Sequence, residues 1–432
     1  MTWGERLRAL RIDLTPLRTS RDFRLLFVAG TVFYLGAMVT YVAIPYQVYT
    51  ETGSNLAVGL VGLVELVPLV VFGLYGGALA DHVDRRRLLV ATGVAQAVAT
   101  AVLAANAFGA FGPDPQLWLV FALAAVLAST SSMQRPSREA LMPRTVRHDE
   151  IPAAQALTSL GMEIGVLVGP AVGGLLIAFV GLGWCFVVDV VGLGVATLMY
   201  LAMGPHPHRE ETTPPSLAGI ATGFRYALGR RDLLGTYLVD IAAMLLAMPV
   251  VLFPALAETV FGRPELIGLL YSAETVGALV ATALSGWTAR VHHHGRAIVL
   301  AAAAYGVCIA LAGLMPTFWL VAGLFALAGA ADMVSGVFRG IVWSQTIPEG
   351  MRGRLAGIEM LSYSVGPLGG QVRAGVTADL WSVRGSITSG GVACVVGVGA
   401  TALWLRDFWS YDARTDEHAV AERAVRAARG EG

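Results

Sequence analysis

The sequence predicts an all-α integral membrane protein with twelve transmembrane helices in two pseudo-symmetric six-helix bundles. Three observations support this fold class. Of the 432 residues, 56% are hydrophobic and 14% are charged, which is too little charge for the surface of a soluble protein of this length. Twelve apolar runs have the length, about 20 residues, that a helix needs to cross a bilayer. The longest polar interruption, at 205–232, divides these runs into six and six.

Each predicted span is a nearly continuous apolar run, because its side chains face lipid. The backbone N–H and C=O groups have no water to bond to in lipid, so each span is expected to be a helix. The approximate ranges are 24–48, 57–79, 88–109, 117–134, 154–179, 184–204, 233–257, 266–288, 297–315, 317–337, 355–378 and 386–405. The chain is therefore expected to contain a basic, amphipathic N-terminal segment on the inner membrane surface, a first bundle, a linker, a second bundle and a tail, at 1–23, 24–204, 205–232, 233–405 and 406–432.

The arginines give the orientation of the spans. Arg supplies all 30 basic residues, and the formal net charge of zero gives no indication of nucleic-acid binding. With the predicted spans, 27 of the 30 fall in the two ends of the chain and in alternate connections, which include Arg138 and Arg339. The positive-inside rule makes that face cytoplasmic. We expect a multi-pass protein of the cytoplasmic membrane with both termini in the cytoplasm.

The turn between the second and third spans has the most specific pattern in the chain. Gly73 and Gly77 precede Asp81, and Arg85 and Arg86 follow it. Small residues allow two helix backbones to approach closely, and a carboxylate at a helix end can face the positive end of a neighbouring helix. An ordinary positively charged loop would explain the arginines, but not the glycines and the aspartate before them.

This turn resembles the signature loop of the major facilitator superfamily, in the variant of its siderophore-exporting branch. The resemblance implies the major facilitator fold. It also implies that Asp81 pairs with the start of the eleventh span, near Arg352 and Arg354, and holds the outward-facing state. The corresponding turn of the second half, 283–290, lacks the acid, so the latch is expected on one side only.

The fifth span contains a second pattern, in which Gly165, Gly169, Pro170 and Gly173 lie on one helix. Glycines four residues apart make a flat face, so tight helix packing alone would explain them. Proline in a transmembrane helix causes a kink at tolerable cost. In the superfamily this pattern is similar to the one that marks exporters, where it is thought to seal the cavity against leak. The resemblance therefore implies export.

Four charged residues lie deep in the predicted spans. Glu65, Asp240 and Glu274 lie about 10–12 Å from the nearer end of their spans at 1.5 Å per residue. Such carboxylates are costly in lipid, and we consider them candidates for proton coupling or for the cavity wall. Packed, hydrogen-bonded carboxyl groups are the alternative. Arg373 is the one deep cation. It could pair with Asp379 or with a carboxylate across the cavity, and it could attract an anionic substrate.

The first span contributes Tyr34 and Tyr41. In the superfamily the first, fourth, seventh and tenth spans line the cavity, so the resemblance implies that these rings can face a bulky, partly aromatic solute. An interfacial belt of aromatic residues is the alternative explanation for tyrosines near a span end.

The resemblance covers nearly the whole chain and implies a transporter, not an enzyme. We expect a secondary active, proton-coupled exporter of a small organic molecule of the siderophore type, working by alternating access as a monomer without cofactor or metal. The sequence contains no nucleotide-binding loop and no metal signature. A multidrug or antibiotic efflux pump is the alternative within the fold. A non-transporting receptor or assembly partner is the alternative outside transport.

Overall fold

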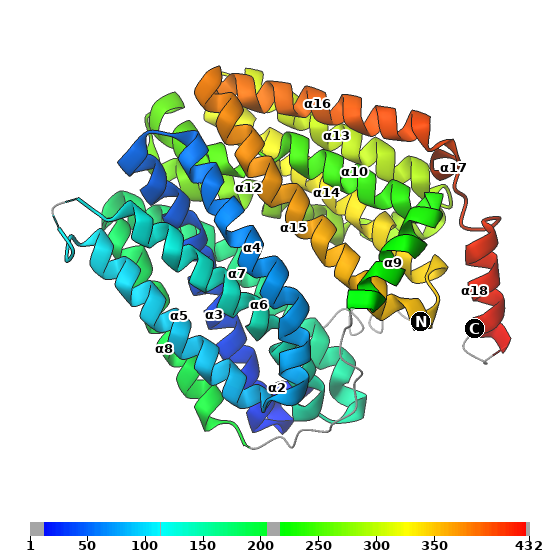
Figure 1. Ribbon diagram of the computed structural model, residues 1–432, viewed down its shortest axis with the longest axis horizontal. Coiled ribbons are helices and arrows are strands. Elements are labelled where there is room, and N and C mark those ends of the chain that lie inside the picture. Colours follow the sequence, from blue (N-terminus) through cyan, green and yellow to red (C-terminus); the bar gives the residue numbers. More distant parts are fainter. Residues whose placement is uncertain (1–12, 113, 205–216, 429–432) are drawn as a thin grey trace, which may run out of the picture. The chain divides into compact units, whose positions relative to one another are not determined.

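The computed structural model describes residues 13–112, 114–204 and 217–428. Within these ranges the side chains are described except at 73–82, 217–221, 223, 349–350, 352–354, 356–358, 360–361, 426 and 428. All regular elements of the described residues are helices, and no strand occurs among them (Figure 1). The predicted all-α fold class is confirmed.

The helices follow the predicted spans in order. The first part of the chain forms α2 (Thr15–Thr19), α3 (Arg21–Thr52), α4 (Asn55–His82), α5 (Arg85–Ala107), α6 (Leu117–Thr145), α7 (Ile151–Phe179) and α8 (Leu182–Ala202). The second part forms α9 (Leu217–Gly229), α10 (Arg231–Ala247), α11 (Phe253–Ala255), α12 (Ile267–Ala283), α13 (His294–Leu314), α14 (Phe318–Thr346), α15 (Glu349–Leu380), α16 (Val383–Trp404), α17 (Arg406–Trp409) and α18 (Glu417–Ala428).

The long helices have the composition of membrane spans. Within the part of the chain that the structure describes, eleven helices are long and apolar enough to cross a bilayer. The remaining predicted span, 355–378, falls within α15, part of whose side chains lie outside the described residues. Large apolar side chains such as Phe179, Leu198 and Trp319 are exposed on the helix surfaces. Lipid covers such surfaces in a multi-pass membrane protein, whereas a soluble protein would bury them.

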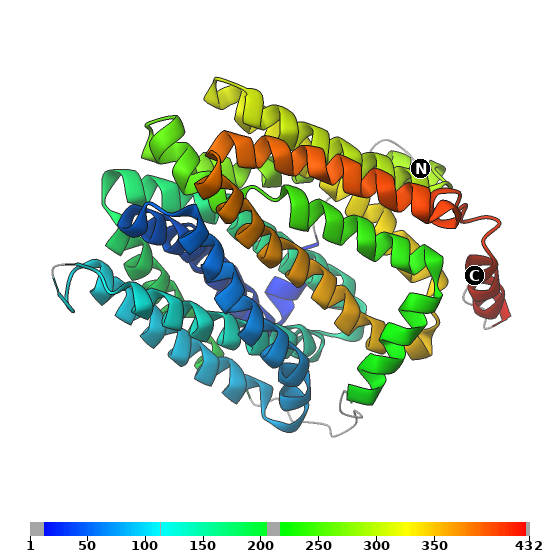
Figure 2. The ribbon, with the colours of Figure 1, turned by 45° about the horizontal axis from the view of Figure 1, so that its top comes forward.

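The contacts divide the chain into two compact units. The first unit comprises Met1–Ile44 and Val67–Pro214, and the second comprises Pro45–Leu66 and Pro215–Gly432. Within the first unit, α5 packs against both α6 and α8. Within the second unit, α13 packs against α14 and α16, and α10 packs against α15 and α16 (Figures 1 and 2).

The second unit includes the end of α3 and the start of α4 because α15 caps α4. The Asp379 carboxylate accepts hydrogen bonds from the Ser54 hydroxyl at 2.7 Å and from the backbone N–H groups of Asn55 and Leu56 at 2.9 Å each. The first N–H groups of a helix have no partner within it, so this carboxylate satisfies two of them. Asp379 therefore ties the N-terminus of α4 to the end of α15.

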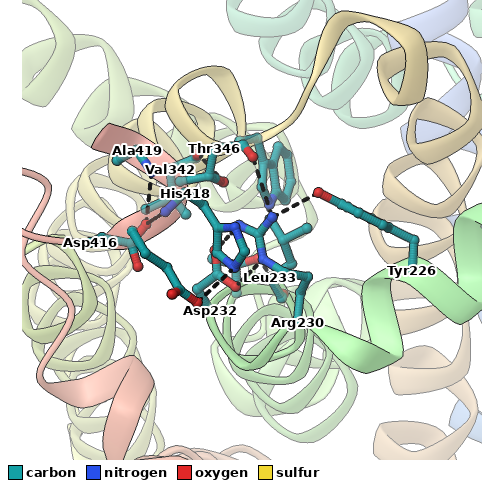
Figure 3. A network of polar contacts seen from close by, with 12 residues as sticks. Tyr226, Arg230, Asp232, Leu233, Val342, Thr346, Asp416, His418 and Ala419 are labelled. Carbon is teal, nitrogen blue, oxygen red and sulfur yellow. Dashed lines mark hydrogen bonds and ion pairs between the residues drawn. The ribbon is translucent and has the colours of Figure 1, made fainter. Parts of the chain in front are cut away.

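The expected linker contains a helix, α9, that is tied to its neighbours by a buried arginine. Arg230 follows α9 and donates to both carboxylate oxygens of Asp232, at 2.9 and 2.5 Å. It also donates to the Tyr226 hydroxyl at 2.8 Å and to the Thr346 carbonyl at 3.4 Å (Figure 3). This network joins α9, the start of α10 and the end of α14. Each of the three guanidinium nitrogens of Arg230 donates at least one hydrogen bond in it.

Candidate functional site

The glycines of the fifth span form the contact between α7 and α3. Gly165, Gly169 and Gly173 are buried, as is Pro170. A Cβ added at Gly165 would come within 2.6 Å of the Tyr34 Cβ, and one at Gly169 within 2.9 Å of the Leu35 carbonyl oxygen. These distances leave no room for a side chain, so α7 packs backbone to backbone against α3. The role of this face in sealing the transport path stays a prediction.

A cavity of about 190 Å³ lies in the first unit, between α3, α6 and α7. It is lined by Tyr34 from α3, by Arg138 from α6 and by Thr158 from α7, among others. The structure therefore places Tyr34, one of the two tyrosines singled out from the sequence, at a cavity wall. Tyr41 lies two turns further along α3, is 36% exposed and does not line this cavity.

Arg138 is buried beside this cavity, with only 6% of its surface exposed. Its guanidinium carbon lies 4.5 Å from the centre of the Phe33 ring and 4.9 Å from that of the Tyr34 ring. Its Nη2 donates to the Gln134 side-chain oxygen at 2.9 Å. Among the described residues, Nε and Nη1 have no hydrogen-bond partner, and no carboxylate is ion-paired with Arg138.

The second unit contains a buried ion pair between α10 and α14. The carboxylate of Asp240 pairs with the guanidinium of Arg339, and each residue is 3% exposed. The Ser362 hydroxyl on α15 donates to Asp240 at 2.8 Å, and the Arg339 guanidinium lies 5.7 Å from the Tyr363 ring centre. A second carboxylate, that of Asp332, lies 3.7 Å from Arg339. Asp240 is therefore held by α14 and α15 together.

The sequence analysis places Arg138 and Arg339 in connections between spans, whereas the structure places both within helices. Both lie inside 29-residue helices, seven residues before the last residue of α6 or α14. The apolar runs end earlier than the helices do, which is why sequence reasoning missed them. One available signal was the apolar segment 340–343 directly after Arg339, which indicates that the span continues past the charge.

Glu274 on α12 differs from Asp240. Its Oε1 is buried and has no hydrogen-bond partner among the described residues. The neighbouring helix is very close, because a Cβ at Gly329 of α14 would come within 2.7 Å of the Glu274 Cα. The Asp332 carboxylate is near enough to act on Glu274 electrostatically. Glu65 on α4 is half-buried.

Arg373 does not pair with Asp379, the partner considered from the sequence. Its Nη1 donates to the Ser386 carbonyl on α16 at 3.3 Å. Asp379 instead binds the start of α4. Arg373 thus fixes α15 against α16. The carboxylate of Asp379, six residues further along the chain, is bound by the N-terminus of α4 instead.

Part of the turn after the second span can be described. Arg85 donates to the Ala140 carbonyl at 3.4 Å, and Arg86 donates to the Tyr200 carbonyl at 3.0 Å. The two arginines thus connect the start of α5 to α6 and to the end of α8. At Gly73, Gly77, Asp81, Arg352 and Arg354 the structure describes the backbone alone. The pairing expected of Asp81 stays a prediction.

A family model described as transmembrane secretion effector matches residues 12–429. The chain belongs to this family. The enterobactin exporter EntS of Shigella boydii serotype 18 is 27% identical to it over 388 residues, which cover 90% of this chain and 92% of the exporter. The enterobactin exporter EntS of Escherichia coli O1:K1 is 26% identical over the same shares. The resemblance to the siderophore-exporting branch is confirmed.

Solved structures show the same fold at low sequence identity. The nucleoside transporter NupG superposes with a TM-score of 0.69 at 11% identity, covering 90% of this chain and 98% of that one. A bacterial homologue of the human lysosomal transporter Spinster, in an inward-facing and unoccupied conformation, gives 0.66 at 15% identity, covering 93% and 96%. The chain is a membrane transporter of the major facilitator type and not an enzyme.

Proposed function

We propose that the protein is a secondary active exporter that moves a small organic molecule of the siderophore type across the cytoplasmic membrane by alternating access. The observation that carries this proposal is the similarity to enterobactin exporters over 90% of the chain. The sequence contains no nucleotide-binding loop. We assign the driving force to an ion gradient, in which one proton crossing a potential of 100 mV supplies ~2.3 kcal/mol.

We assign proton coupling to Glu274. Asp240 is bound by Arg339 and Ser362, so protonating it requires breaking a buried ion pair. The Oε1 of Glu274 has no such partner among the described residues, so it can gain or lose a proton without that cost. Glu65 is the second candidate, because it is half-buried in a transmembrane helix.

Secretion tests the substrate part of the proposal. A deletion strain and its parent are grown in low iron, and the secreted metabolites are compared, with the gene returned on a plasmid as the control. Loss of an iron-binding metabolite from the medium, restored by the plasmid, supports siderophore export. Unchanged secretion together with altered drug resistance would instead identify a multidrug efflux pump.

Vesicles with an imposed pH gradient test the coupling. Stimulation of transport by the gradient should disappear in Glu274→Gln. The matched variants Asp240→Asn and Glu65→Gln report on the other two carboxylates. Full stimulation in all three variants would exclude proton coupling through these residues.

The proposal includes cytoplasmic termini, a monomer, a latch at Asp81 and a seal at the α3–α7 face. Reporter domains fused to each end measure the orientation, and the arginine distribution predicts that both report from the cytoplasm. Asp81→Asn should shift the protein away from the outward-facing state, which accessibility of single cysteines placed in the cavity detects.

A further inference from the structure

Two of the buried arginines, Arg138 and Arg339, occupy equivalent places in the two halves of the chain. Helices α3 and α10 both begin with Arg-Asp, at Arg21 and Arg231, and counted from there Gly30 and Asp240 are each the tenth residue. Helices α6 and α14 both have 29 residues, and Arg138 and Arg339 are each seven residues from the end. Each guanidinium also lies near a tyrosine ring, although the rings come from different helices, Tyr34 from α3 and Tyr363 from α15.

The two places differ in the residue at the tenth position of α3 or α10. In the second half Asp240 provides the carboxylate for Arg339. In the first half the equivalent residue is Gly30, which has no side chain to offer Arg138. A Cβ at Gly30 would lie 3.6 Å from the Arg138 Cδ and 3.7 Å from its Nη1, which is ordinary van der Waals contact. A Cβ at Gly30 would therefore touch the Arg138 side chain without displacing it.

Gly30 borders the first-unit cavity, which Tyr34 and Arg138 also line. The other charged lining residues, Arg135 and Glu139, are paired with each other at 3.0 Å, which leaves the positive charge of Arg138 unbalanced in the lining. The remaining wall combines hydroxyl or amide groups with apolar ones, namely Thr31, Gln155, Thr158, Ser159, Leu26, Phe27, Met142 and Met162.

We propose that this cavity binds an anionic oxygen of the transported solute, which takes the place beside Arg138 that the Asp240 carboxylate takes beside Arg339. The inference rests on the proposed export function and adds the substrate class, an organic acid with an aromatic or apolar body that presents a carboxylate or phenolate. A guanidinium donates charge-assisted hydrogen bonds to such oxygens, and Nε and Nη1 of Arg138 have no hydrogen-bond partner among the described residues. The Tyr34 ring and the apolar wall suit the body of the solute.

Binding of a matched pair of aromatic probes tests the proposal. The full chain is placed in lipid nanodiscs and loaded with radiolabelled salicylate, which is displaced by unlabelled salicylate or by uncharged salicylamide. Because a hydrogen bond to a charged group is worth about 1.5–3 kcal/mol, salicylate should compete at concentrations at least about tenfold lower than salicylamide.

Substitutions at Gly30 and Arg138 isolate the cause. Gly30→Ala adds a methyl group without charge, whose contacts are ordinary ones, and it is the reference against which the effect of the charge in Gly30→Asp is measured. Gly30→Asp supplies an internal carboxylate and should abolish the preference for salicylate. Arg138→Gln should abolish it too, and it serves as the second test if Gly30→Asp does not fold.

Each outcome decides between the two proposals. Equal competition by salicylate and salicylamide in the wild type, or a preserved preference in Gly30→Asp, overturns the anion site. Low-iron secretion separates this from the export function. Secretion that does not depend on the chain overturns siderophore export. Secretion that depends on the chain, but is the same with Gly30→Asp as with Gly30→Ala, overturns the anion site and leaves the exporter standing.

Discussion

Arg138 in the first half and Arg339 in the second half have the same place in their helices and different surroundings. Arg339 is enclosed by the Asp240 carboxylate, the Tyr363 ring and, at 3.7 Å, the Asp332 carboxylate. Arg138 has one hydrogen bond to an amide and two aromatic faces, and it borders a cavity. The same position thus forms a buried ion pair in the second half, which we call the closed tie. In the first half the arginine has no carboxylate partner among the described residues and borders a cavity, and we call it the open arginine.

The difference indicates which half is specialised for structure at this position and which for binding. A buried charge without a counter-charge lowers stability, so a protein retains one where function uses it. A buried charge with a fixed partner needs no such explanation, because the pair joins two helices. We therefore read the Asp240–Arg339 pair as a structural tie and Arg138 as a group kept available for a ligand.

Breaking the closed tie should have the largest effect on stability. Asp240→Ala leaves the Arg339 guanidinium buried without its main partner, and the free energy of unfolding should fall by about 3–5 kcal/mol. Titration with denaturing detergent, followed by circular dichroism, measures this loss. The double variant Asp240→Ala/Arg339→Met should recover most of it, because it also removes the stranded charge. A loss below about 1 kcal/mol for Asp240→Ala would contradict the structural role.

Introducing an equivalent ion pair in the first half should raise the free energy of unfolding, by less than breaking the Asp240–Arg339 pair lowers it. Gly30→Asp places a carboxylate beside Arg138, and the gain from pairing exceeds the cost of burying the new charge because Arg138 is already desolvated. We expect a gain of about 1–2 kcal/mol in the free energy of unfolding. Gly30→Asn, which has the same shape without the charge, should give less than half of it. A destabilised Gly30→Asp with an unaffected Gly30→Asn would show that the two positions are not equivalent.

The class of protein and the order of the helices could be predicted from the sequence, because a bilayer imposes length, apolar character and internal hydrogen bonding on every span. The glycine pattern at Gly165 and Gly169 likewise predicts close packing, since only small residues permit it. The family motif around Arg85 and Arg86 pointed to the transporter type before any geometry was known. These features depend on local sequence, and local sequence was sufficient.

The partners of buried charges could not be predicted, because they depend on which helices meet. Arg138 and Arg339 were assigned to connections, since an apolar run shows where lipid contact ends and not where the helix ends. Arg373 was considered a partner of Asp379, but the free N–H groups at the start of α4 bind that carboxylate. The significance of Gly30 becomes visible only when its neighbour across the helix contact is known.

Removing the open arginine should change stability less than removing the closed one. Arg138→Gln deletes a charge that donates to Gln134 at 2.9 Å and also acts on the Tyr200 hydroxyl. The lost ring contacts and the relieved desolvation offset each other, so the free energy of unfolding should stay within about 1 kcal/mol of the wild type. Arg339→Gln, measured by the same detergent titration, is the matched comparison and should lose several-fold more. Equal losses in the two variants would remove the distinction between the halves.

The smallest effect is expected for an ion pair that is close but exposed. Arg231 and Asp407, in the same unit as the closed tie, approach to 2.6 Å with side chains 69% and 65% exposed. Water and salt screen such a pair, so Asp407→Ala should cost about 0–0.5 kcal/mol, and high salt should remove even that. The Asp240–Arg339 pair joins the same two residue types, and little but burial separates the two cases. If Asp407→Ala destabilised the protein as much as Asp240→Ala, burial would not be the cause of the difference, and the stability argument for a ligand at Arg138 would lose its basis.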